Sequence, residues 1–251
     1  MSSSPPLVTI VIPTVNRLGL FRKALASALA QTVPVEIIVS DNGSSDGTEV
    51  VLPSLDLPAN VRRFRHAPTM PVQDHGWFLI SQVRTEWTVF LSDDDFLEPG
   101  FAAGVVELID EKPDVAFVYT GCDLFYADVA VPGHVGPRFE NAPDFLFNFM
   151  DGKRNISMCA TAFLTQGLRD AGRQPDNVLI GDMYYWTKAL ESGGVVGCDD
   201  RHLSNYFFYR PGMTSETSRN NVINWARESR EVATRMRSLI LADPRNTHDK
   251  A

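Results

Sequence analysis

The stretch LVTIVIPTVNR, residues 7–17, begins with an uninterrupted run of aliphatic and β-branched residues and ends in a polar turn. A run without polar alternation is typical of a strand buried on both faces, as in a parallel sheet covered by helices. The residues that follow place apolar side chains at helical spacing: Leu18, Phe21, Leu25 and Leu29. The start of the chain therefore predicts one strand–helix unit of an α/β fold.

The same unit recurs along the first half of the chain. Further strands are predicted at residues 35–40, 61–64, 87–91 and 115–121. Helical patterns separate them, including a short helix that Ser45 or Asp46 can cap. This alternation predicts a doubly wound, mostly parallel, Rossmann-like sheet. Ligands of such sheets bind at the carboxyl ends of the strands, and three sets of polar residues follow strand ends here: Thr14, Asp41 and Asp93–Asp95.

The second half of the chain follows a weaker pattern. Residues 128–143 are rich in proline and glycine, which predicts a loop. Beyond it the sequence predicts a helix at residues 181–193, a strand at 203–210 and a terminal helix at 221–241. We therefore expect one domain over residues 1–251, with a less regular C-terminal half.

Composition places the chain among globular proteins. Of its 251 residues, 44% are apolar and 22% charged, which argues against a disordered or collagen-like chain. The formal net charge of -8 disfavours nucleic acid as a partner, because phosphate attraction needs a basic face. No apolar run approaches the roughly 20 residues that span a bilayer, and the N-terminus lacks a signal core. We expect a cytoplasmic protein with reduced cysteines.

The segment FLSDDDFLEPG, residues 90–100, places three carboxylates directly after a predicted strand. Like charges this close repel one another, so a folded chain keeps them together in solvent or around a cation. Carboxylate oxygens suit Mg²⁺ or Mn²⁺. The alternative is a solvated cluster that caps the next helix. The position after a buried strand favours the cation.

The turn after the first strand, PTVNRLG at residues 13–19, lacks the glycine-rich fingerprint of dinucleotide-binding folds. The Walker phosphate loop is absent from the sequence as well. A bound diphosphate would therefore need a metal ion as its main counter-charge.

Three segments, VTIVIPTVNR, VSDNGSSDGT and FLSDDDF, occur in an order and spacing that resemble the N-terminal half of family 2 glycosyltransferases, which have the GT-A fold. The resemblance implies a nucleotide-sugar-binding half at residues 7–125 and an acceptor and catalytic-base half at residues 126–218. A C-terminal helix and tail at residues 219–251 would complete a single GT-A domain.

The resemblance also implies roles for individual residues. Asp41 would accept a hydrogen bond from the nucleobase, and Asp93 would face the ribose or the metal. Asp95 would bind a Mn²⁺ or Mg²⁺ ion that bridges the diphosphate. The other donor-binding residues would be Pro13, Thr14, Arg17, Asp74, Asp94 and Arg210. The alternative for Asp41 is a turn residue that hydrogen-bonds its own backbone.

Inverting transfer needs a carboxylate that takes the proton of the acceptor hydroxyl as it attacks the anomeric carbon. GDMYYWTKAL, residues 181–190, resembles the acidic-pair motif of the family, so Asp182 is the candidate catalytic base. Gly181 stands where the family usually has a glutamate. The alternative is that Asp182 caps its helix, and one residue can do both.

A second departure concerns the diphosphate. Family members often carry a histidine shortly after a Tyr-Arg pair, in contact with the metal or the diphosphate, but YRPGMTSE at residues 209–216 has none. The diphosphate would then be held by Arg210 or by the hydroxyls of Thr214 and Ser215, and catalytic competence stays open. His75 is expected to be a hydrogen-bonded core histidine rather than a ligand.

Taken together, the resemblance implies a metal-dependent, inverting glycosyltransferase that moves one sugar from a nucleoside-diphosphate sugar, with UDP as the expected nucleotide. Candidate acceptors are hydroxyls of a glycan, a lipid-linked sugar or a small molecule. The QxxRW motif and membrane helices of processive members are missing, which favours single addition. Two alternatives stay open: a sugar-nucleotide nucleotidyltransferase and a non-catalytic nucleotide-sugar-binding protein.

The terminal helix and the residues just before it carry five arginines beside an apolar stripe: Arg219, Arg227, Arg230, Arg235 and Arg237. A basic amphipathic helix can lie on an anionic membrane surface, so peripheral contact with the inner face of the membrane is one expectation. An ordinary surface helix packed on the domain is the other.

Overall fold

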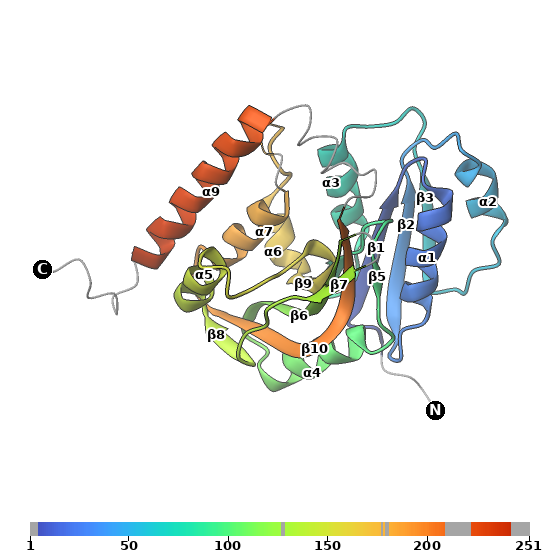
Figure 1. The fold of residues 1–251 in the computed structure, drawn as a ribbon. Helices are drawn as coiled ribbons and strands as arrows, with labels where there is room; N and C mark the ends of the chain where they lie inside the picture. Colours follow the sequence, from blue (N-terminus) through green and yellow to red (C-terminus); the bar gives the residue numbers. More distant parts are fainter. Residues whose placement is uncertain (1–4, 127–128, 177, 179–180, 209–221, 242–251) are drawn as a thin grey trace, which may run out of the picture.

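A ten-stranded sheet forms the centre of the molecule (Figure 1). The computed structural model describes residues 5–126, 129–176, 178, 181–208 and 222–241. The main path of the sheet has the order β3-β2-β1-β4-β9-β6-β10-β5, with β7 paired to β6 and β8 paired to β10. Helices cover both faces, as the unalternated strands predicted.

The first four strands run parallel to one another, in agreement with the predicted doubly wound start. They are β1 (Val8–Thr14), β2 (Val35–Asp41), β3 (Val61–Arg65) and β4 (Trp87–Phe90). The connecting helices are α1 (Leu18–Leu29), α2 (Thr48–Ser54) and α3 (Val72–Gln82). The carboxyl ends of β1, β2 and β4 therefore meet at one edge of the sheet.

The second half of the sheet is mixed. β9 (Thr161–Leu164) is antiparallel to both β4 and β6 (Val115–Tyr126), so β6 has the direction of β4. β10 (Val195–Phe208) runs parallel to β6, and the short β5 (Phe96–Leu97) runs antiparallel to β10. Most strands on the main path thus share one direction, which confirms the predicted mostly parallel sheet.

The prediction of a loop at residues 128–143 was wrong in part. This segment contains β7 (Val129–Pro132) and β8 (Phe139–Asn141), which pair antiparallel with β6 and β10. Both strands are short and lie off the main path of the sheet, so their pairing is set by the neighbouring strand rather than by a local pattern. β10 also begins at Val195, eight residues before the predicted start at residue 203. Its charged residues remain part of the strand because a β-bulge accommodates them.

The strands of the first half are buried on both faces. Ile10 and Ile12 of β1 pack in a cluster with α1 and α4 (Phe101–Glu111), whereas Val11 packs in a second cluster on the opposite face. The predicted apolar stripe of α1 is confirmed at Phe21, but Leu29 is 39% exposed, because Ala28 takes the innermost place in the last turn.

The second cluster is covered by α3 of the first half and by the helices of the C-terminal half. The latter are α5 (Ala142–Met150), α6 (Thr165–Ala171), α7 (Gly181–Leu190) and α9 (Val222–Leu241), and the short turn η1 (Met158–Ala160) precedes β9. α9 lies across α5 and α7 (Figure 1), and its Met236 is buried there while Arg230 and Arg237 are exposed. In the parts of the chain that the structure describes, no helix is both long and apolar enough to cross a membrane.

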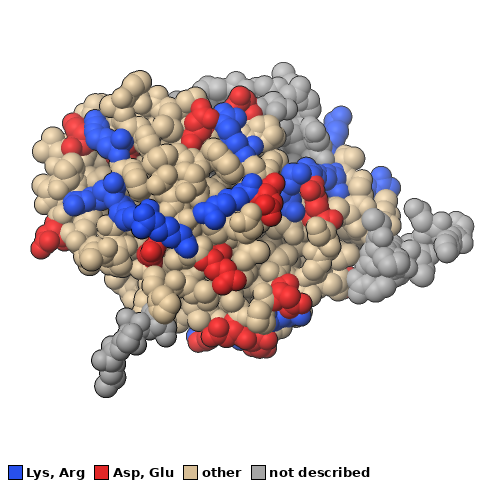
Figure 2. Space-filling model, turned by 180° about the vertical axis from the view of Figure 1, so that it is seen from behind, with Lys and Arg blue, Asp and Glu red and all other residues tan. Residues whose placement is uncertain are grey.

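β3 lies at one edge of the sheet and carries three arginines, which protect an exposed edge from pairing with other chains. Arg62 pairs with Glu36 at 3.7 Å, and Arg63 donates to the carbonyl oxygens at the end of α2. On the reverse face of the molecule basic and acidic side chains occur together (Figure 2), so this face has no field of a single sign.

Candidate active site

The site is built where the first parallel strands end. Thr14, the last residue of β1, lies in register with Asp41, the last residue of β2. The acidic segment Asp93–Asp95 follows β4, which pairs with the other side of β1. The structure thus brings together the strand-end residues that the sequence predicted at one edge.

Asp93 is held by two donors, one from the end of β1 and one from the turn that follows it. Thr14 Oγ1 donates to Asp93 Oδ2 at 2.7 Å, and Arg17 Nη1 donates to Asp93 Oδ1 at 2.8 Å. The same Arg17 nitrogen lies 3.2 Å from Asp94 Oδ2. Burial raises the pKa of Asp93, while Arg17 and the Thr14 hydrogen bond act in the opposite direction. The guanidinium therefore offsets part of the repulsion within the cluster.

Asp95 was expected to be a metal ligand at the open edge of the sheet. The structure instead encloses it. Its side chain is enclosed, the residue is 3% exposed, and Oδ1 accepts the backbone N–H of Phe207 at 3.0 Å. Burial raises the pKa of Asp95 well above its usual range, and the charge of Asp94 raises it further. The side chain of Asp94 is 17% exposed, so Asp94 is the carboxylate of this segment with the most access to a ligand.

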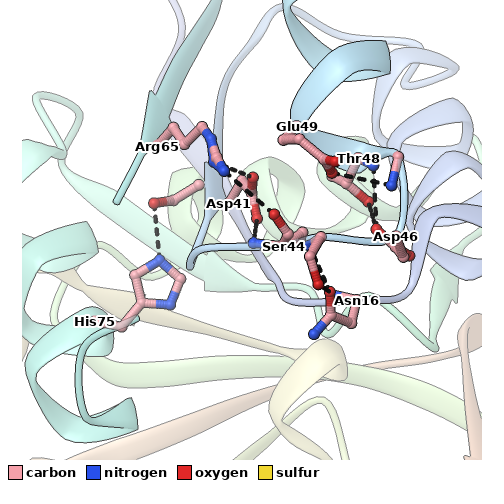
Figure 3. Close-up of polar contacts among 11 residues, drawn as sticks. Asn16, Asp41, Ser44, Asp46, Thr48, Glu49, Arg65 and His75 are labelled. Carbon is pink, nitrogen blue, oxygen red and sulfur yellow. Dashed lines mark hydrogen bonds and ion pairs between the residues drawn. The ribbon is translucent and has the colours of Figure 1, made fainter. Parts of the chain in front are cut away.

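Asp41 is fully buried at the end of β2, and its carboxylate contacts Ser44 and Arg65 (Figure 3). Oδ1 accepts the backbone N–H of Ser44 at 2.9 Å, which confirms the turn interpretation, and Oδ2 lies 3.5 Å from Arg65 Nη1. The turn needs Gly43 at φ +84°, because a Cβ there would lie 2.6 Å from Thr69 Oγ1. A cavity of about 280 Å³ between α2 and β3 is lined in part by Asp41 and Arg65.

The turns after β1 and β2 are tied to each other by side chains (Figure 3). Asn16 adopts φ 53°, and its N–H donates to Ser44 Oγ at 2.8 Å. Asp46 accepts the N–H of Leu18 at 2.9 Å and the N–H of Thr48 at 3.1 Å. One carboxylate therefore satisfies the first turns of both α1 and α2, which extends the single cap that the sequence predicted.

Asp182 lies at the start of α7, as predicted, and its Oδ1 accepts the N–H of Met183 at 2.8 Å. Burial raises the pKa of Asp182. Burial also raises the pKa of Tyr206 on β10, and the charges of Asp95 and Asp182 raise it further. The charges of the acidic segment and of the candidate base therefore both act on Tyr206, although these residues are far apart in the sequence.

Asp74 is drawn into an ion pair that the sequence did not predict. It lies in the first turn of α3, and its Oδ1 is 2.5 Å from Nε of Arg173 in the segment before α7. Its neighbour His75 is buried, its Nε2 lies 2.8 Å from Ser40 Oγ, and burial lowers its pKa to about 4. His75 is therefore the core histidine that the sequence predicted.

The remaining predicted residues are placed as follows. Pro13 is half-buried directly before Thr14. Arg210, Thr214 and Ser215 lie outside the described residues. Arg65 was not predicted as a site residue, although it ends the strand next to β2 and so follows from the same rule as Asp41. Tyr206 was not predicted either, because no local pattern distinguishes it from a core aromatic residue.

Comparison with known proteins identifies the family. The model of "Glycosyl transferase family 2" matches residues 9–163, more than half of the chain. "Glycosyltransferase AglE" of Haloferax volcanii is 24% identical over 224 residues, which cover 79% of this chain and 68% of that protein. A Campylobacter jejuni protein named "GalNAc(5)-diNAcBac-PP-undecaprenol beta-1,3-glucosyltransferase" is 30% identical over 124 residues, covering 47% of this chain and 38% of its own length.

Solved structures show the same fold. S. aureus TarS 1–349 in complex with UDP-GlcNAc matches with a TM-score of 0.69 at 15% identity, covering 96% of this chain and 74% of TarS. The mannosyltransferase PcManGT of Pyrobaculum calidifontis, in complex with GDP-Man and Mn²⁺, matches with a TM-score of 0.65 at 18% identity, covering 95% and 71%. The chain therefore belongs to glycosyltransferase family 2, and its sheet has the GT-A fold of these enzymes.

Proposed function

We propose that this glycosyltransferase moves a single sugar from a UDP-sugar to a hydroxyl acceptor, with inversion and with the help of Mn²⁺ or Mg²⁺. The observation that carries the proposal is the junction of Thr14, Arg17 and Asp93 at the strand ends, in register with Asp41. Ligands of parallel sheets bind at this edge.

The nucleoside would lie beside Asp41, with Pro13 and Thr14 on the same edge. The cavity of about 280 Å³ next to Asp41 and Arg65 supports this placement, because the side chain of Arg65 is 38% exposed and can donate to a heterocycle. The carboxylate of Asp41 is enclosed by its turn, so the turn would have to open before Asp41 could accept a hydrogen bond from the base. UDP is proposed as the nucleotide because the similar TarS structure contains UDP-GlcNAc. The other similar structure, PcManGT, contains GDP-Man instead.

The carboxylates at the strand ends fit a hard divalent cation in their chemistry. Among the residues that the structure describes, no three His, Cys, Asp or Glu side chains surround a common metal position. The diphosphate of the donor would have to complete the coordination, as in Mg²⁺ sites with one or two carboxylates. We place Asp94 in this role instead of Asp95, because Asp95 is enclosed. The bound ion would neutralise charge on the departing nucleoside diphosphate.

Asp182 would accept the proton of the acceptor hydroxyl. Burial raises its pKa, which makes the carboxylate a stronger base. A catalytic base also needs a fixed orientation. The hydrogen bond from Met183 N–H orients the Asp182 carboxylate at the start of α7.

A non-catalytic binder is the alternative that the sequence motivates through Gly181. A Cβ at position 181 would meet only the flexible end of the Gln174 side chain, which can move aside, so packing does not explain this glycine. Membership of the glycosyltransferase family favours transfer over both this alternative and nucleotidyl transfer.

The acceptor is proposed to be a lipid-linked or glycan hydroxyl, as the name of the Campylobacter jejuni relative suggests for that protein. Peripheral contact with the inner face of the membrane is part of this proposal. Exposed apolar side chains on α5 and basic ones on α9 support it: Phe147, Met150, Arg230 and Arg237. Sedimentation with phosphatidylglycerol vesicles tests the contact, and no binding at low salt would remove it.

The experiment for the proposed function is release of UDP from UDP-sugars with Mn²⁺ present, for wild type and Asp182→Asn. The proposal expects hydrolysis or transfer by wild type with at least one UDP-sugar, and a large loss in the variant. UDP binding by both proteins without turnover by either would favour the non-catalytic binder. Binding of neither UDP nor GDP by wild type would remove the donor site altogether.

A further inference from the structure

Arg17 spans two adjacent carboxylates at the point where the proposed cation would bind. Its Nη1 lies 2.8 Å from Asp93 Oδ1 and 3.2 Å from Asp94 Oδ2. The side chains of Arg17, Asp93 and Asp94 are 23%, 7% and 17% exposed, so all three are largely shielded from solvent. One positive charge is thus already built into the acidic segment.

The backbone of Arg17 is fixed, which keeps its side chain at this position. Its carbonyl oxygen accepts the N–H groups of Leu20 and Phe21 at 3.0 and 2.9 Å, and the next N–H, that of Leu18, is bound by Asp46. Arg17 is the N-cap of α1 but makes no side-chain cap hydrogen bond. Its guanidinium is therefore directed to the end of β4 by the turn, not by its own helix.

Asp93 and Asp94 differ in how easily another cation could replace Arg17 beside them. Both oxygens of Asp93 accept short hydrogen bonds, one from Thr14 and one from Arg17. The contact of Arg17 with Asp94 is longer, and the side chain of Asp94 is more exposed. Asp94 is therefore the carboxylate from which a divalent ion can displace the guanidinium at the smaller cost.

A divalent ion on Asp94 would also lie close to the retained guanidinium. A charge of two and a charge of one about 5 Å apart repel by an amount that lowers affinity on the order of tenfold, even with the screening of bulk water. A diphosphate relieves this repulsion, because its negative charges attract both cations at once.

We propose that Arg17 is a resident counter-cation that weakens binding of the free metal ion and so makes metal binding depend on the nucleotide. This inference rests on the proposed donor site. Without a donor, Arg17 offsets one of the two negative charges of Asp93 and Asp94. With a donor, Arg17 keeps Asp93, releases the oxygen of Asp94, and faces the diphosphate together with the ion.

The test is titration with Mn²⁺ in the absence of nucleotide, followed through the electron paramagnetic resonance signal of the free ion. Arg17→Gln is expected to bind Mn²⁺ on the order of tenfold more tightly than wild type. Arg17→Lys keeps the charge and is expected to stay within about twofold of wild type. Arg62→Gln is the matched control, because Arg62 has the same 23% side-chain exposure but pairs with Glu36 away from the site.

Circular dichroism establishes that Arg17→Gln is folded. A folded Arg17→Gln that binds Mn²⁺ no more tightly than wild type would overturn the proposal, as would equal tightening in Arg17→Lys or Arg62→Gln. Should Arg17→Gln fail to fold, Arg17→Met, which also removes the charge, is measured in its place with the same expectation, and equal Mn²⁺ affinity of wild type with and without saturating UDP also overturns the inference. Failure of the donor site is seen separately, as wild type that binds neither UDP nor GDP.

Discussion

Thr14 Oγ1 donates a hydrogen bond of 2.7 Å to Asp93 Oδ2, and this contact joins the end of β1 to the end of β4. The two strands are parallel neighbours, so their last residues reach the same edge of the sheet. Asp93 is 6% exposed, and such a buried carboxylate depends on its hydrogen bonds to stay ionised. The contact therefore links the fold directly to the chemistry proposed for this edge.

Thr14→Val removes this donor without changing the shape of the side chain. We expect a loss of roughly tenfold in UDP affinity, or about 1–1.5 kcal/mol, because a buried charged acceptor loses one partner. Isothermal titration calorimetry measures it. Thr9→Val is the control, since Thr9 is a buried residue of the same strand that contacts Thr85 instead. Equal UDP affinity of Thr14→Val and wild type would show that Asp93 does not serve the donor.

Asp182→Asn keeps the shape at the start of α7 but removes the base. Turnover is expected to fall about a hundredfold or more while donor affinity changes little. Burial raises the pKa of Asp182 above its usual value, so the wild-type rate should fall as pH drops through that raised pKa, and the variant should lose this acid limb. Asp170→Asn on α6 is the exposed control. A full rate in Asp182→Asn would assign the base elsewhere.

The lowered pKa of His75 predicts that the stability of the fold depends on pH. Its folded-state pKa of about 4 lies below its ordinary value of 6.5, so the neutral form is favoured by folding. The neutral histidine therefore contributes about 3 kcal/mol at most to the free energy of unfolding. This contribution is complete above pH 6.5 and is lost as pH falls toward 4. Urea unfolding of His75→Gln between these pH values should show a shallower decline than wild type. The exposed His134→Gln should keep the wild-type slope, and identical slopes for all three proteins would contradict the account.

Asp46→Ala should destabilise the fold by about 1–2 kcal/mol, because the first N–H groups of α1 and α2 lose a shared acceptor. Asp46→Asn keeps an oxygen acceptor and should recover most of the loss. Urea denaturation measures both variants. A change below about 0.5 kcal/mol in Asp46→Ala, as for an ordinary surface substitution, would mean that water replaces the carboxylate at both helices.

The sequence allowed the first half of the fold to be predicted because local pattern and tertiary environment agree there. The runs around Ile10 and Ile37 are unalternated because each strand is covered by helices on both faces. The same parallel order brings Thr14 and Asp41 into register, so the site at the strand ends followed from the strand prediction alone.

The rest of the site depends on contacts between distant segments, which a local pattern does not encode. Asp95 turns inward because the N–H of Phe207, 112 residues later, provides its partner. Asp74 is held by Arg173, 99 residues away, from a segment with no regular pattern. The strands β7 and β8 likewise form only because β6 and β10 offer them an edge.

The most direct measurement of the central claim is a crystal structure of the protein soaked with UDP and Mn²⁺, with the anomalous signal of manganese recorded. The account predicts an anomalous peak at the carboxylate of Asp94, bridged to the diphosphate, and density for the uracil ring beside Asp41. Nucleotide density bound at another face of the molecule, or a manganese peak remote from the end of β4, would contradict it.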